Sequence, residues 1–105
     1  MSKDLNQILN LQDIMDPIQS RFGKYFELAC DSSINKITAT NNKGLFCRFD
    51  LIYKDDEKIC ISYKLLDYLN YDILDESCKL FDRSTDNLLE MLYDFIAVSL
   101  QEIIA

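Results

Sequence analysis

Four cysteines and eighteen acidic residues carry most of the potential chemistry of this sequence, because the chain contains no histidine. Without an imidazole base, no Ser-His or Cys-His nucleophile pair can form. No two cysteines form a CxxC pair, so we expect no zinc site. We expect four reduced thiols that fill space in the core, at Cys30, Cys47, Cys60 and Cys78.

Other catalytic and cofactor motifs are also absent. The chain has two glycines, Gly23 and Gly44, too few for a P-loop or a dinucleotide fingerprint. The acidic run 55–57 lies between Lys54 and Lys58 and is typical of a solvated hairpin tip, since it lacks the ligand spacing of an EF-hand. We therefore expect no enzyme activity, no catalytic residue, no cofactor and no metal.

The net charge of −7 lies in one part of the chain. Residues 1–64 contain as many bases as acids, whereas residues 65–105 contain nine acids and only two bases, Lys79 and Arg83. An acidic surface of this kind favours a basic protein partner and repels nucleic acid. The alternative is that these carboxylates belong to solvated helix faces.

The densest acidic segment, residues 67–76, also contains two tyrosines. Tyrosine rings supply contact area at an interface, and carboxylates meet arginine or lysine through charge-assisted hydrogen bonds. The alternative is that both rings pack at the edge of the core. The candidate partner-binding residues are Asp67, Tyr68, Tyr71, Asp72, Asp75 and Glu76.

A chain of 105 residues has the length of one domain, residues 1–105. Apolar residues at three- and four-residue spacing predict helix in the N-terminal segment. Asp16 followed by Pro17 resembles a helix start, so we expect a break near residue 16 and a short second helix that ends at Gly23.

From residue 24 to about 65 the apolar period becomes two, which predicts strands. Gly44 suits the left-handed position of a three-residue hairpin loop after the strand 37–40. The resulting register places Cys47 and Cys60 on opposite faces, which disfavours a disulfide between them. The expected pairs are Ile37 with Phe49, Ala39 with Cys47, Asn41 with Leu45, Phe49 with Tyr63, Leu51 with Ile61 and Tyr53 with Ile59.

After residue 65 the pattern again favours helices. Apolar spacing from Ile73 to Phe81 predicts a short helix, and residues 84–86 offer caps for a final helix that ends at Ile104. The wide apolar arc of this final helix predicts packing on the sheet and on the first helix or another molecule, so the chain is expected to be a monomer or a homodimer through the final helix. The expected fold class is α+β: N-terminal helices, a three- or four-stranded antiparallel meander, and C-terminal helices packed on one face.

No apolar run is long enough for a membrane span and no signal peptide is evident, so we expect a cytoplasmic protein without membrane contact. The leading hypothesis is an acidic inhibitor or immunity protein that occludes a basic partner, above all a nuclease toxin. Two alternatives stay open: a small acidic secretion chaperone or adaptor, and a phage-type antagonist that mimics DNA.

Overall fold

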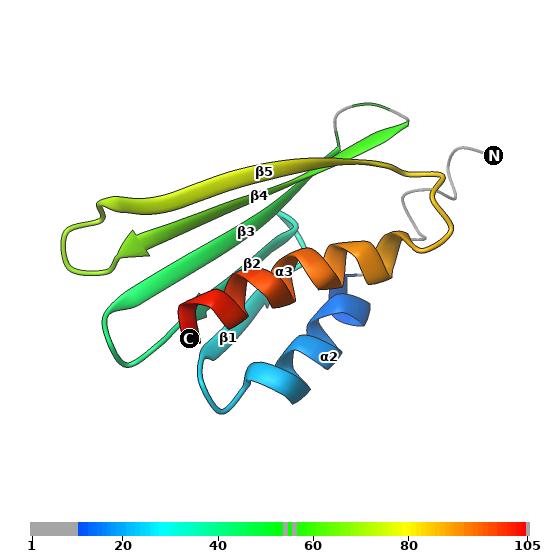
Figure 1. Ribbon diagram of the computed structural model, residues 1–105. Helices are drawn as coiled ribbons and strands as arrows, with labels where there is room; N and C mark the ends of the chain where they lie inside the picture. The colour runs from blue at the N-terminus through cyan, green and yellow to red at the C-terminus, as the bar shows by residue number, and fades with distance from the viewer. Residues whose placement is uncertain (1–10, 54, 56, 105) are drawn as a thin grey trace.

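A five-stranded antiparallel sheet and two helices make up the computed structural model, which describes residues 11–53, 55 and 57–104 (Figure 1). Each strand pairs with the next one along the chain, so the sheet is a simple meander. The expected α+β class is confirmed. The elements are α2 (Leu11–Phe22), β1 (Glu27–Asp31), β2 (Lys36–Thr40), β3 (Leu45–Tyr53), β4 (Lys58–Asp67), β5 (Ile73–Asp82) and α3 (Leu88–Ile104).

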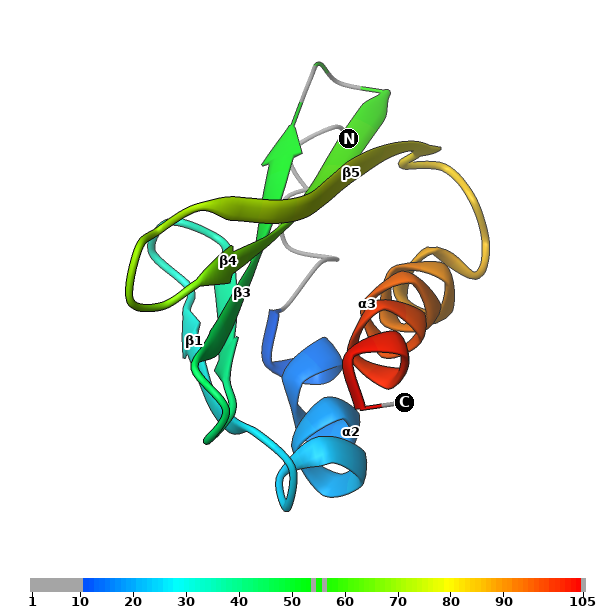
Figure 2. The same cartoon turned by 60° about the vertical axis from the view of Figure 1, so that its left-hand side comes forward.

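Both helices lie on the same face of the sheet, which we call the inner face (Figure 2). The core between the two layers takes alternate residues of the central strands, such as Phe49 of β3 and Ile61 of β4, both fully buried. The helices contribute fully buried apolar residues such as Ile18 and Leu92. The opposite, outer face of the sheet carries no helix among the described residues, which gives the molecule two layers.

The register expected for the three central strands is confirmed. Ile37 pairs with Phe49, and Phe49 pairs with Tyr63. Gly44 has a φ of 85°, the left-handed conformation that the β2–β3 loop requires. The Asn41 carboxamide oxygen accepts hydrogen bonds from the amides of Lys43 and Leu45, at 2.9 and 3.1 Å, and so holds this loop.

The break expected near residue 16 is wrong, because α2 continues through Pro17. Proline cannot donate to the carbonyl of Asp13, four residues earlier, but both residues lie on the exposed side, where water can bind that carbonyl. The buried side of α2 continues from Ile14 to Phe22 and holds the helix in one piece. The helix does end before Gly23 as expected. The residues before Leu11, on which the earlier part of the N-terminal helix was predicted, lie outside the described residues.

The short helix expected from Ile73 to Phe81 is also wrong, because these residues form the edge strand β5. Phe81 is the only buried residue of this strand, so β5 lacks the alternating pattern that marks a half-buried strand. A register shift opposite Leu65 and Leu66 disturbs the alternation further. The sheet consequently has five strands rather than three or four.

Helix α3 starts at Leu88, one residue after Asn87, whose carbonyl accepts the amide of Met91 at 2.9 Å. The cap is thus Asn87 rather than a residue of the expected 84–86 segment. As expected, α3 packs on both the sheet and α2, and the Arg21 Nη1 donates to the Tyr93 hydroxyl at 3.3 Å. In the described part of the chain, neither helix has the length and hydropathy needed to cross a membrane.

Candidate functional site

The turn between β4 and β5 is organised by Asp67, the last residue of β4. Its carboxylate accepts hydrogen bonds from the amides of Leu69 and Asn70, at 2.9 and 3.4 Å. Its carbonyl accepts the amide of Tyr71 at 2.6 Å, and its own amide donates to the Asp72 carbonyl at 2.9 Å. This predicted site residue therefore shapes the turn. We call residues 67–76 the β4–β5 tip.

The two tyrosines of the tip form part of an aromatic row. The ring centroids of Tyr68 and Tyr71 lie 6.3 Å apart, and the Tyr68 ring lies 6.2 Å from that of Phe46 on β3. Tyr71 has a φ of 59°, a left-handed conformation that is uncommon for a residue with a side chain. The residue is 70% exposed, so the alternative that Tyr71 packs at the core edge does not match its position.

Apolar residues outside the six predicted positions extend this surface. Leu69 is 84% exposed, and Ile73 and Leu74 are each about half exposed. A run of exposed large apolar residues marks an interaction surface more often than scattered single ones do. The signal was present in the sequence, but the expected helix placed Ile73 and Leu74 on a buried helix face.

The other carboxylates of the tip, those of Asp72, Asp75 and Glu76, are exposed. The Asp75 carboxylate accepts the amide of Glu76 at 2.9 Å. Among the described residues, the ion pairs are Arg48–Asp50 and Lys58–Asp82, and neither involves the tip. Lys64 lies opposite Glu76 in the β4–β5 register and is the cation nearest to it along the ladder. The tip thus combines exposed apolar area with three acids that form no ion pair with another described residue.

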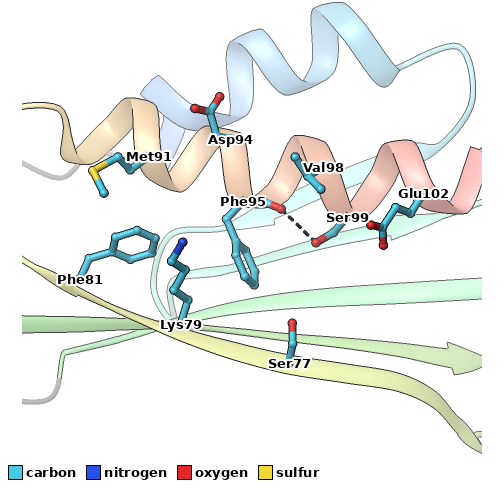
Figure 3. A pocket seen from close by; sticks show the side chains of 9 residues that line it. All are labelled: Ser77, Lys79, Phe81, Met91, Asp94, Phe95, Val98, Ser99 and Glu102. Atoms are coloured by element: carbon cyan, nitrogen blue, oxygen red, sulfur yellow. Dashed lines mark hydrogen bonds between the residues drawn. The ribbon is translucent and has the colours of Figure 1, made fainter.

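A groove of about 420 Å³ lies between β5 and α3, next to the tip (Figure 3). Lys79 points into it from β5, with its Nζ 5.4 Å from the centre of the Phe81 ring. Met91 and Val98 line the α3 side and are both exposed. The groove thus lies between residues of the edge strand and residues of the last helix.

Acidic groups lie near Tyr63 on β4, the strand beside β5. Burial raises the pKa of Tyr63, and nearby acidic groups, first the Cys47 thiol and then the Asp75 and Glu102 carboxylates, raise it further. Both carboxylates belong to residues at the tip or along the groove. A cation is therefore favoured at this end of the inner face.

The turn that contains Asp55 and Glu57 is held by a carboxylate in the same way as the tip. The Asp55 carboxylate accepts the amides of Glu57 and Lys58, at 2.8 and 2.9 Å, and so holds its own turn, as expected of a hairpin end. Nowhere in the described ranges do three Cys, Asp or Glu side chains gather in a way that could hold a metal ion.

The β4–β5 tip brings all six predicted site residues onto one hairpin, with Asp67 inside the turn and the others around it. The exposed apolar residues and Phe46 complete the surface. Comparisons of the chain with protein families, with curated proteins and with solved structures give no match.

Proposed function

We propose that this protein binds a basic protein through the β4–β5 tip and inhibits it by covering its active site, as an immunity protein covers a nuclease toxin. The observation that supports this most strongly is the composition of the tip. Exposed Tyr68, Leu69 and Tyr71 lie beside carboxylates that have no ion-pair partner among the described residues.

Apolar and acidic groups have separate roles in this proposal. Interfaces gain most of their binding energy from a few well-packed residues, with tyrosine among the most frequent. The tip presents two tyrosines and Leu69 on a turn that Asp67 holds in shape, so little ordering is needed on binding.

The carboxylates would take the place of substrate phosphates. A nuclease active site is cationic because it binds phosphate, and Asp72, Asp75 and Glu76 would meet its arginine and lysine side chains. The same charges disfavour nucleic acid as a partner. A DNA-mimicking antagonist would use this surface in the same way, and differs only in the class of protein bound.

The direct experiment titrates a purified basic nuclease domain with this protein and follows cleavage of a fluorescent nucleic-acid substrate. We expect stoichiometric inhibition, and at least about tenfold weaker binding for Asp72→Lys, because truncated or reversed charges at a buried pair cost about 2–5 kcal/mol. Glu27→Lys is the matched control, since it changes the net charge equally on β1, at the opposite edge of the sheet. Equal effects of the two variants would remove the tip as the binding site.

Tyr71→Asn tests the aromatic part separately. Asparagine tolerates the left-handed conformation at this position, so the substitution removes the ring without adding backbone strain. We expect binding to weaken by about tenfold or more, in the range of an interface hot spot, while the unfolding midpoint stays near that of the wild type.

A secretion chaperone or adaptor is the second candidate, and the edge position of β5 favours it. The ten residues of β5 pair with β4 on one side, and no described strand pairs with the other side. An extended client segment could add there as a sixth strand and place alternate side chains in the groove beside α3. Hydrogen exchange with a bound partner separates the two candidates. A client on β5 protects amides along 75–82, whereas an occluded toxin protects residues 67–74 of the tip.

A further inference from the structure

Cys60 and Cys78 are the two thiols that the fold brings together. Their Sγ atoms lie 3.0 Å apart, and each belongs to a reduced cysteine on one of two paired strands, β4 and β5. Cys60 pairs with Leu80 and Ser62 pairs with Cys78, so the two cysteines are diagonal neighbours on the outer face of the sheet. The twist of a sheet shortens the distance across one diagonal, which lets the two side chains meet.

The two thiols differ in access. Cys60 is 3% exposed although it lies on the outer face, where Ile52 of β3 and Leu80 of β5 flank it in the register. Cys78 is exposed on the edge strand, so the expectation that all four thiols fill space in the core is wrong for this residue. This arrangement provides one thiol that reagents in solution can reach and a second, shielded thiol in contact with it.

The other two cysteines cannot take part. Cys47 is buried on the inner face, in contact with the core between sheet and helices. Cys30 packs against the same core from β1, three strands away from β4. Neighbouring strands in a sheet are about 4.8 Å apart, so β1 and β4 are separated by three such spacings. That separation is too large for a disulfide between Cys30 and Cys60.

We propose that Cys60 and Cys78 are a redox modification site, at which a small-molecule disulfide such as oxidised glutathione converts the two thiols into an intramolecular disulfide. The Cys78 thiolate attacks one sulfur of the reagent, the reagent's S–S bond breaks, and one glutathione thiolate leaves. The Cys60 thiolate then attacks the Cys78 sulfur of this mixed disulfide and releases the second glutathione. Two protein thiols are oxidised and one reagent disulfide is reduced to two glutathione thiols, which take up the two protons that the protein thiols lose.

The disulfide would close a ring that contains the whole β4–β5 tip. Residues 61–77 lie between the two cysteines, so the edge strand could no longer separate from β4 without opening a covalent bond. We expect amide exchange along β5 to slow by about tenfold or more on oxidation. The disulfide reduces the conformational freedom of the state in which β5 has separated from β4, so this local opening becomes less favourable.

The test incubates the full chain with oxidised glutathione, blocks remaining thiols under denaturing conditions, and analyses a tryptic digest by mass spectrometry. Cleavage after Lys58, Lys64 and Lys79 places Cys60 in peptide 59–64 and Cys78 in peptide 65–79. We expect two blocked thiols instead of four, a mass loss of two hydrogen atoms, and a linked pair of these peptides. A chain that keeps four thiols, that only adds glutathione at Cys78, or that links two chains through Cys78 would overturn the proposal.

Variants assign the roles of the two thiols. Cys60→Ser should keep glutathione on Cys78 as a stable mixed disulfide, since the second attack is lost. Cys78→Ser changes an exposed residue, leaves the core intact and should retain all three remaining thiols. Cys30→Ser should form the linked peptides as the wild type does. A loss of two thiols from Cys78→Ser would show that another pair reacts and would contradict the assignment.

Discussion

The amide of Tyr68 donates a 2.8 Å hydrogen bond to the carbonyl oxygen of Gly44. This bond joins the β4–β5 tip to the loop between β2 and β3, and it continues the β3–β4 ladder one step beyond the Leu45–Asp67 pair. The left-handed backbone of Gly44 therefore supports the position of an aromatic residue of the candidate binding surface.

Gly44→Val should destabilise the protein by about 1–2 kcal/mol, the order of cost for a β-branched residue in the left-handed region. Apart from the two adjacent residues, no described residue has a heavy atom within 4 Å of the Cβ that the substitution adds, so the cost comes from backbone strain and not from a clash. Urea denaturation measures it. Gly44→Asn is the matched control and should cost much less, because asparagine tolerates this conformation. Equal losses for the two variants would contradict the role assigned to the backbone.

Asp67→Ala should lower the free energy of unfolding by about 1–2 kcal/mol, because its carboxylate accepts two amides of the turn. Asp72→Ala should leave stability nearly unchanged, since the residue is exposed and its carboxylate takes no part in the side-chain hydrogen bonds between described residues of the tip. Denaturation curves of both variants separate the residue that shapes the tip from one available to a partner. A stable Asp67→Ala variant would mean that the backbone alone holds the turn.

Association with a basic partner should slow with salt. The Debye screening length falls from about 10 Å at 0.1 M salt to about 3 Å at 1 M salt. An association rate that is raised by electrostatic attraction should therefore fall by about tenfold or more over this range. Surface-binding kinetics measure it, and the dissociation rate should change less. An on-rate independent of salt would indicate that the apolar residues of the tip act without electrostatic steering.

Burial raises the pKa of the Cys47 thiol from 9.0 to about 12. An acid whose pKa is higher in the folded state releases its proton more easily when unfolded, so its contribution to stability is complete below pH 9 and is lost between pH 9 and about 12. Wild-type stability should therefore decline more steeply over this range than that of Cys47→Ala, by roughly 1.4 kcal/mol per pH unit. Denaturation midpoints at several pH values test the difference, and parallel curves would contradict it.

The central strands could be predicted because one face of each is buried. Alternation in β3 and β4 and the loop at Gly44 together allow only one register, and Phe49 and Ile61 lie where that register places them. β5 could not be predicted in this way. Its side chains are exposed on both faces apart from Phe81. Its sequence therefore lacks the alternation of apolar and polar residues that the burial of one face produces.

The candidate site was predictable in part for a related reason. Charge and tyrosine content identified the segment 67–76 without any structure, because these properties do not depend on the local fold. The contribution of Leu69, Ile73 and Leu74 required the structure, since an apolar residue in a sequence is expected to be buried until its surroundings are known. The approach of Cys78 to Cys60 depended on recognising β5 as a strand.

The meander topology has a consequence for the order of folding. Every strand pair closes a short hairpin between neighbours in the chain, so the sheet can grow stepwise as a ribosome releases it. The helical layer cannot form stepwise in this way, because α2 and α3 are far apart in the sequence. The hydrogen bond between Arg21 and Tyr93, for example, joins residues 72 positions apart. The first described element thus completes its packing only once the last one has been synthesised.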